Sequence, residues 1–212
     1  MKRSSLLFLP FLLFLVGAFV SCDEVEEVGK YDNWRERNEA FADSIKALTG
    51  ENYVSTPEGA DAMELGKLYA IQIPSTSGDK GAQYVYCKKL VKNETGERPL
   101  FSGYHSTVSA YYYGTIIIGD KFDGNFEGYS ATDRNIPIPP QKNVTEFNSP
   151  TTFSVTGVIP GWTWPLQYMR TGERWMLYIP WQSGYGATGD NYGRILGYSA
   201  LTFDILLDRI VE

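Results

Sequence analysis

Residues 158–189, VIPGWTWPLQYMRTGERWMLYIPWQSGYGATG, constrain the fold of this chain more than any other stretch. Pro160 breaks whatever structure precedes it. Trp162, Leu166 and Met169 then follow at i, i+4 and i+7, the spacing of one helical face. This pattern predicts a short helix of little more than two turns with one apolar side.

The rest of this stretch predicts a strand and a loop. Pro165 is compatible with the helix because we expect it at about the fourth helical position, where no intrahelical N–H bond is lost. Gly172 supplies a stop, and residues 175–179 alternate at period two, which predicts a strand with two unlike faces. Pro180 ends that strand, and a turn-rich loop with one tyrosine follows over residues 183–189.

The N-terminus has the pattern of a secretory signal peptide over residues 1–21. Basic residues precede an apolar run that is short for a membrane span and ends at small residues. The following Cys22 resembles the lipidated cysteine of bacterial lipoproteins, and the alternative is an ordinary cleaved signal with an incidental cysteine. With Cys22 acylated, only Cys87 remains, so the mature protein has no intrachain disulfide, and we expect Cys87 to be a buried thiol in a strand.

Residues 22–65 are predicted to form a lipid-anchored tether and an N-terminal helix. An acidic run follows Cys22; it resembles a surface-export signal in some bacterial lipoproteins and an inner-membrane retention signal in others. Residues 31–48 place four apolar side chains on one helical face: Trp34, Phe41, Ile45 and Leu48. We expect this face to pack on its own domain, with a homodimer contact as the alternative. Residues 49–65 read as a linker with one helical turn.

The remaining pattern favours a sheet-rich core. Residues 67–73 and 84–91 read as strands, and residues 108–118 read as a longer strand with a bulge at Gly114. Residues 124–150 form a proline-rich connection without clear periodicity. A connection of this length is commonly functional or mobile, and we expect it to border the active site because it leaves directly from Asp123.

Composition excludes several classes of function. The formal net charge of −6 gives no basis for nucleic-acid binding. His105 is the only histidine, which excludes a Ser-His-Asp or Cys-His triad and most zinc sites. The sequence therefore predicts neither a metal nor a cofactor.

Five motifs in a fixed order resemble the FKBP-type peptidyl-prolyl cis-trans isomerases. They are YYG at 112–114 with GDKFD at 119–123, VIPGW at 158–162, MRTGE at 169–173, YGATG at 185–189 and LTFDILL at 201–207. The resemblance covers roughly residues 82–211, in a form similar to bacterial lipoproteins. It implies an α+β fold over residues 66–212, in which a twisted antiparallel sheet of five or six strands wraps around the short helix.

The resemblance also implies a role for each site residue. Trp162 matches the floor under a substrate proline, and Tyr185 matches a hydroxyl that bonds a substrate carbonyl. Asp123 matches a rim carboxylate that bonds the counterpart of Tyr112, so we expect a catalytic role for Asp123, Tyr185 and Tyr112. The walls correspond to Tyr112, Phe122, Val158, Ile159 and Phe203, and the Ile159 N–H corresponds to a second donor.

Three departures from the family pattern bear on substrate choice. Residues 195–199 replace a proline-containing rim, Thr151 stands where we expect a wall residue that is often aromatic, and residues 124–150 are inserted. The predicted function is isomerisation of X-Pro bonds, which assists the folding of proline-containing polypeptide clients. We expect the protein to act in the envelope of a Gram-negative bacterium, as an outer-membrane lipoprotein that faces the periplasm or the cell surface. The alternatives are a non-catalytic binding module or chaperone subunit of the same fold, and a surface protein whose insertion binds an outside ligand.

Overall fold

The structure, a computed structural model, describes residues 29–74, 83–103 and 106–211. The predicted signal peptide, the lipidation site Cys22 and His105 lie outside the described residues. One compact unit extends from Asn33 to Glu212, and residues 29–32 belong to a second unit. The compact unit therefore begins well before residue 66, where we predict the isomerase domain to start. In the described ranges, no helix is long and apolar enough to cross a bilayer.

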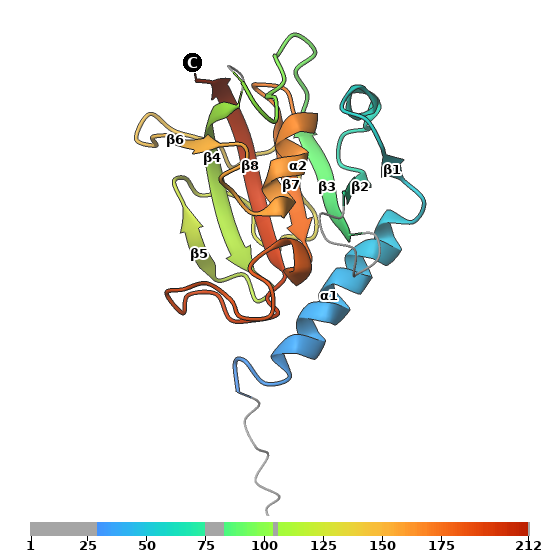
Figure 1. The fold of residues 1–212 in the computed structure, drawn as a ribbon, viewed down its shortest axis with the longest axis vertical. Helices are drawn as coiled ribbons and strands as arrows, with labels where there is room; N and C mark the ends of the chain where they lie inside the picture. Colours follow the sequence, from blue (N-terminus) through green and yellow to red (C-terminus); the bar gives the residue numbers. More distant parts are fainter. Residues whose placement is uncertain (1–28, 75–82, 104–105, 212) are drawn as a thin grey trace, which may run out of the picture. The chain divides into compact units, whose positions relative to one another are not determined.

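The described part of the compact unit consists of one sheet and two α-helices (Figure 1), which pack into different apolar clusters. The helices are α1 (Trp34–Thr49) and α2 (Pro160–Tyr168), with 3-10 turns η1 (Glu58–Ala62) and η2 (Trp181–Ser183). The strands are β1 (Tyr53–Val54), β2 (Leu68–Ile73), β3 (Gln83–Val91), β4 (Thr107–Ile116), β5 (Lys121–Gly124), β6 (Thr151–Ser154), β7 (Arg174–Ile179) and β8 (Leu201–Ile210).

The predicted FKBP-like α+β architecture is confirmed, with a larger sheet than expected. Among the described residues the sheet has eight strands in the order β1-β2-β3-β7-β8-β4-β5, and β6 pairs with β4. All pairings are antiparallel except β1 with β2, which makes the sheet mixed. β1, with two residues, falls inside the segment that we predict as a linker, because so short a run carries no periodicity.

Helix α2 packs against one face of the sheet, as its apolar spacing predicts. It begins at Pro160, so Pro165 is the sixth helical residue rather than about the fourth, and its missing N–H removes a bond to the Gly161 carbonyl. A Cβ on Gly161 would lie 2.4 Å from Ile179 Cγ2, so a glycine is needed for this close approach of helix and sheet. The Met169 N–H donates to the Pro165 carbonyl at 2.9 Å, where the helix ends.

Helix α1 packs on the opposite face of the sheet, against its own domain. Phe41 and Ile45 contact the aromatic side chains of β3 and β7. The Ala200 N–H donates to the Asn38 carboxamide at 2.8 Å, which ties the helix to the start of β8. The prediction fails at Leu48, which is 73% exposed, because Thr49 at i+4 from Ile45 takes the buried position instead.

Strand β7 is buried on both faces, so its two sides differ less in burial than the alternation predicts. Trp175, Leu177 and Ile179 belong to the apolar cluster under α2, while Met176 and Tyr178 belong to the cluster under α1. Both faces of this central strand therefore contribute to the core.

The inserted segment 124–150 lies on the α1 face of the sheet. Its Tyr129 is buried in the cluster under α1, and the Tyr129 N–H donates to Asp204 at 2.9 Å. Asp204 also accepts two bonds from the buried Arg174 guanidinium, at 2.8 and 2.6 Å. The expectation that this segment borders the active site is wrong for its middle part, because these contacts hold that part on the face opposite α2. Its two ends stay beside β4, where the Tyr112 N–H donates to the Asn125 carboxamide at 2.9 Å and Asn148 donates to the Asn125 carbonyl at 3.0 Å.

Candidate active site

A cleft of about 400 Å³ lies between α2, the strands β4, β5, β6 and β8, and the loop after η2. We call it the Trp162 cleft. Its lining comprises Tyr112, Phe122, Asp123, Phe153, Gly157, Val158, Ile159, Trp162, Tyr185 and Phe203. The fold therefore brings together all eight side chains that the sequence places in one site. No residue of the insertion 124–150 is among this lining.

Trp162 is the floor of the cleft and is only 3% exposed. The rings of Tyr112, Phe153 and Phe203 meet the indole edge-on, with centroid distances of 5.4, 5.2 and 5.1 Å. Edge-to-face contacts of this kind are the favoured geometry for aromatic pairs, so the rings hold one another in place. The indole N–H is buried and has no hydrogen-bond partner among the described residues.

Phe153 is a wall residue that the sequence reading missed. We predict Thr151 as the wall, but Thr151 is exposed and its hydroxyl accepts from the Asn125 carboxamide at 3.1 Å. Thr151 and Phe153 lie two residues apart on β6 and so point to the same face, but only Phe153, the third residue of TTFS, lines the cleft. The sequence does indicate this wall residue, because Phe153 is the single aromatic residue of TTFS.

The predicted bulge at Gly114 is present, and the extra residue is Phe122 on β5. Gly114 pairs with Asp123 and Thr115 pairs with Lys121, which leaves Phe122 unpaired. A Cβ on Gly114 would lie 2.6 Å from Phe203 and 2.9 Å from Phe122. The glycine thus leaves room for two wall rings, which contact each other edge-on at 5.4 Å.

Asp123 is the acidic group of the rim, and two tyrosine hydroxyls share its environment. Burial, together with the charge of Asp123 and a hydrogen bond to its carboxylate, raises the pKa of Tyr112 well above its ordinary value. Burial and then the charge of Asp123 also raise the pKa of Tyr185. Both phenols therefore stay protonated at neutral pH and keep an O–H that can donate a hydrogen bond.

The loop that carries Tyr185 is fixed by its own contacts. The Gly186 N–H donates to the Trp181 carbonyl at 2.9 Å, and the Ile195 N–H donates to Asp190 at 2.8 Å. Arg194 also bonds Asp190, at 3.1 Å. Residues 195–199, where the sequence departs from the family pattern, do not line the cleft, and Ile195 is buried in the core.

The Ile159 N–H is a second available donor in the cleft. Ile159 precedes the first residue of α2, and its carbonyl accepts from Trp162 and Thr163 at 2.8 and 3.1 Å. Its N–H has no hydrogen-bond partner among the described residues. Within the same described ranges, no group of three His, Cys, Asp or Glu residues could hold a metal ion.

Comparisons with known proteins agree with this geometry. Residues 102–208 match a sequence model of the family described as FKBP-type peptidyl-prolyl cis-trans isomerase. The chain is 52% identical to the macrophage infectivity potentiator of Trypanosoma cruzi over 67 residues, which is 32% of this chain and 34% of that protein. It is 30% identical to the FKBP-type peptidyl-prolyl cis-trans isomerase FkpA of Escherichia coli strain K12 over 152 residues, which is 71% of this chain and 47% of that protein.

A solved structure extends the similarity to the fold. The crystal structure of FkpA from Escherichia coli matches with a TM-score of 0.50 and 26% identity, covering 85% of this chain and 62% of that chain. The matched region spans about a third to a half of the length of the curated relatives.

Proposed function

Because this chain belongs to the family of FKBP-type peptidyl-prolyl cis-trans isomerases, we propose that its Trp162 cleft catalyses rotation about X-Pro bonds in polypeptides. The observation that carries the proposal is an open aromatic cleft in which a buried indole floor meets one carboxylate and two protonated phenols at the rim.

The chemistry needs no nucleophile and no metal. The barrier to peptide bond rotation is about 18–20 kcal/mol and comes from amide resonance, which withdraws charge from nitrogen onto the carbonyl oxygen. Twisting the bond removes that resonance and moves charge off the oxygen, so an apolar cleft favours the twisted state over the planar one. A ten-thousandfold acceleration requires roughly 5.5 kcal/mol of differential stabilisation.

Different residues of the cleft would contribute to this stabilisation. The proline ring would pack on the Trp162 indole between the rings of Phe153 and Phe203, which excludes water from the bond that rotates. The Tyr185 hydroxyl and the Ile159 N–H would donate to substrate carbonyls and hold the chain on either side of that bond. Asp123 would fix Tyr112 and polarise the rim.

A binding module without turnover is the alternative, as a chaperone or as a subunit of an envelope assembly. A cleft covered by the insertion would favour it, because substrate could not reach the floor. The insertion packs on the other face of the sheet and none of its residues lines the cleft. We therefore favour the enzyme.

The first test is the rate of cis-to-trans relaxation of short X-Pro peptides with the purified protein. Tyr185→Phe removes one donor and should lower kcat/KM about tenfold, and Asp123→Ala should lower it by a similar factor. Tyr192→Phe is the matched control, because Tyr192 lies in the same loop and is 82% exposed. Absence of acceleration by well-folded protein, across several residues before proline, would leave the binding module as the function.

We propose that the protein acts in the bacterial cell envelope as a lipoprotein anchored at Cys22. The signal pattern of residues 1–21 supports this, as does the similarity to a Legionella longbeachae protein named outer membrane protein MIP, 33% identical over 106 residues, which is 50% of this chain and 34% of that protein. Globomycin blocks processing of lipoprotein precursors, so treated cells should accumulate a precursor of higher mass. Normal processing in its presence would contradict lipidation.

A homodimer through the N-terminal helix stays a prediction. Because Ile45 and Asn38 of α1 are buried against their own domain, such a dimer would use the outer side of the helix, where Leu48 is exposed.

A further inference from the structure

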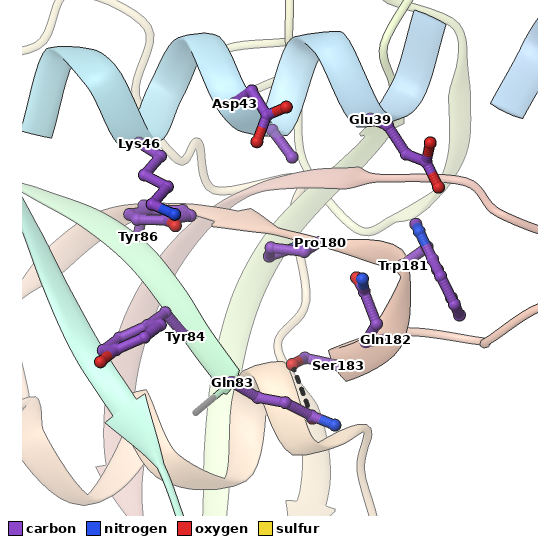
Figure 2. Close-up of a pocket in the computed structure, with 11 residues that line it drawn as sticks. Glu39, Asp43, Lys46, Gln83, Tyr84, Tyr86, Pro180, Trp181, Gln182 and Ser183 are labelled. Carbon is purple, nitrogen blue, oxygen red and sulfur yellow. Dashed lines mark hydrogen bonds between the residues drawn. The ribbon is translucent and has the colours of Figure 1, made fainter. Parts of the chain in front are cut away.

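A second hollow, of about 370 Å³, lies between α1, the start of β3 and the residues that follow β7 (Figure 2). We call it the Trp181 hollow. It shares no lining residue with the Trp162 cleft, and it is of similar volume. Both volumes fall within the range of about 300–1,000 Å³ that is usual for ligand sites.

Aromatic and proline side chains form the base of this hollow. Figure 2 shows Tyr84 and Tyr86 from β3 on one side, with Pro180 and Trp181 on the other. The Trp181 ring is held edge-on by Tyr198 at 4.9 Å, with 72° between the planes. The base is therefore a preformed set of flat apolar surfaces on well-supported elements.

Trp181 also presents a donor that the fold leaves unused. Its indole nitrogen is buried and has no hydrogen-bond partner among the described residues. Buried polar groups are nearly always paired in folded proteins, and an unpaired one is unfavourable. In Figure 2 this nitrogen lies at the end of the ring nearer α1, on the side of Glu39. Because this atom has almost no accessible surface, a ligand in the hollow contacts the Trp181 ring and not its N–H group.

The wall formed by α1 is predominantly acidic. Glu39 and Asp43 are four residues apart, which places both carboxylates on the side of the helix that lines the hollow. Glu39 accepts a bond from Arg35 at 2.9 Å, whereas no ion pair of Asp43 occurs among the described residues. Lys46 lies at the far end, next to Tyr86. The end nearer Trp181 is thus complementary to a positive charge.

We propose that the Trp181 hollow binds an extended, proline-containing polypeptide segment that carries an arginine or lysine beside its prolines. Proline-rich segments adopt the polyproline II helix, an extended conformation with three residues per turn and no internal hydrogen bonds. Aromatic-lined grooves recognise such segments because the helix is preformed and little entropy is lost on binding. The basic side chain pairs with Asp43 and Glu39.

This site would add client binding to the proposed isomerase function, and the proposal rests on that function. A client bound at the Trp181 hollow stays attached to the same molecule as the Trp162 cleft, which raises the effective concentration of its other prolines there when the chain between them is long enough to span both sites. The hollow itself performs no chemistry, so short X-Pro substrates that reach only the cleft do not depend on it.

The test is binding of a short peptide with two prolines separated by two residues and an arginine beside the first. The readout is the indole N–H signal of Trp181 in a proton–nitrogen correlation spectrum of the purified protein, assigned by its loss in Trp181→Phe. We expect this signal to shift in saturable fashion. Trp181→Phe and Asp43→Lys should each weaken affinity about fivefold or more, as expected for loss of part of the aromatic base or of one charge pair. Asp43→Lys, on α1, should accelerate short X-Pro peptides as the unaltered protein does.

Peptide controls define the ligand class. Replacing the arginine by glutamate, or both prolines by alanine, should weaken the shift of the Trp181 signal. A signal that does not move, or binding that is equal in Asp43→Lys and the unaltered protein, would overturn the proposal. Equal binding of the alanine peptide would overturn the proline-rich ligand class. Each of these results can occur with full isomerase activity, so failure here is distinguishable from failure of the proposed function.

Discussion

At the scale of single residues, the candidate site depends on one position without a side chain. Gly114 lies two residues before the end of β4, next to the rings of Phe122 and Phe203. Phe203 in turn contacts the Trp162 indole, so the position of the floor and of two walls depends on the space that this glycine leaves. The bulge at Phe122 and the glycine opposite it form one local arrangement.

Gly114→Ala should therefore damage the cleft more than the fold. The added Cβ must displace two packed rings, and overpacking of this kind costs about 1–3 kcal/mol of stability. Misplacement of the walls by a fraction of an ångström should lower kcat/KM for X-Pro peptides by about tenfold to a hundredfold. Gly59→Ala in η1 is the control, because the nearest atom to its Cβ is a threonine hydroxyl at 3.3 Å. Full activity of Gly114→Ala would show that the rings have room to move.

At the scale of elements, one carboxylate links the turn η1 to two loops. Asp61 of η1 accepts two bonds from Arg170, at 2.8 and 2.9 Å, and a further bond from Arg98. Arg170 follows α2, and Arg98 lies in the loop between β3 and β4. The hydrogen bonds of Arg170 and then of Arg98 lower the pKa of Asp61 far below its usual value.

These three bonds predict a defined dependence of stability on pH. A carboxyl group whose pKa is lowered by folding stabilises the native state above its unfolded pKa of about 3.9, and this contribution is lost as pH falls further. We expect Asp61→Asn to lower the Tm at pH 7, and the difference from the unaltered protein to shrink between about pH 4 and pH 2. Glu51→Gln, at an exposed position, should leave both Tm and its pH profile unchanged. A constant Tm difference down to pH 2 would contradict this role of Asp61.

At the scale of the whole molecule, the sheet separates the candidate active site from the insertion. Helix α2 and the Trp162 cleft occupy one face, while α1 and the part of the segment 124–150 around Tyr129 cover the other. The insertion is held by Tyr129, whose hydroxyl accepts from the N–H groups of residues 141 and 142 at 2.9 and 3.2 Å. Its role in the folded protein is to bury the second face of the sheet.

Tyr129→Ala should lower the stability of the protein without changing its activity. Removing a buried aromatic side chain costs about 3–5 kcal/mol, so we expect a clear drop in Tm. The kcat/KM for short X-Pro peptides, measured per folded molecule, should stay unchanged because no residue of the insertion lines the cleft. Phe147→Ala, in the same segment but 88% exposed, should alter neither quantity. A parallel loss of activity in folded Tyr129→Ala would mean that the two faces are coupled.

The sequence by itself determined the elements and most of the candidate site. Helical and alternating periodicities located α2, β7 and β8, because these patterns follow from local backbone geometry. The order of the motifs then assigned eight side chains to one cleft, and the fold brings all eight together.

Only the tertiary structure decided which face each connection covers. Residues 124–150 have no periodicity, so their place on the α1 face depends on contacts with Asp204 and Arg174, more than thirty residues away in the chain. The same holds for Phe153, which reaches the cleft through the pairing of β6 with β4, and for Leu48, left exposed beside the buried Thr49. Contacts between residues distant in sequence leave no signal in local spacing, and these are the points at which the sequence reading was wrong or incomplete.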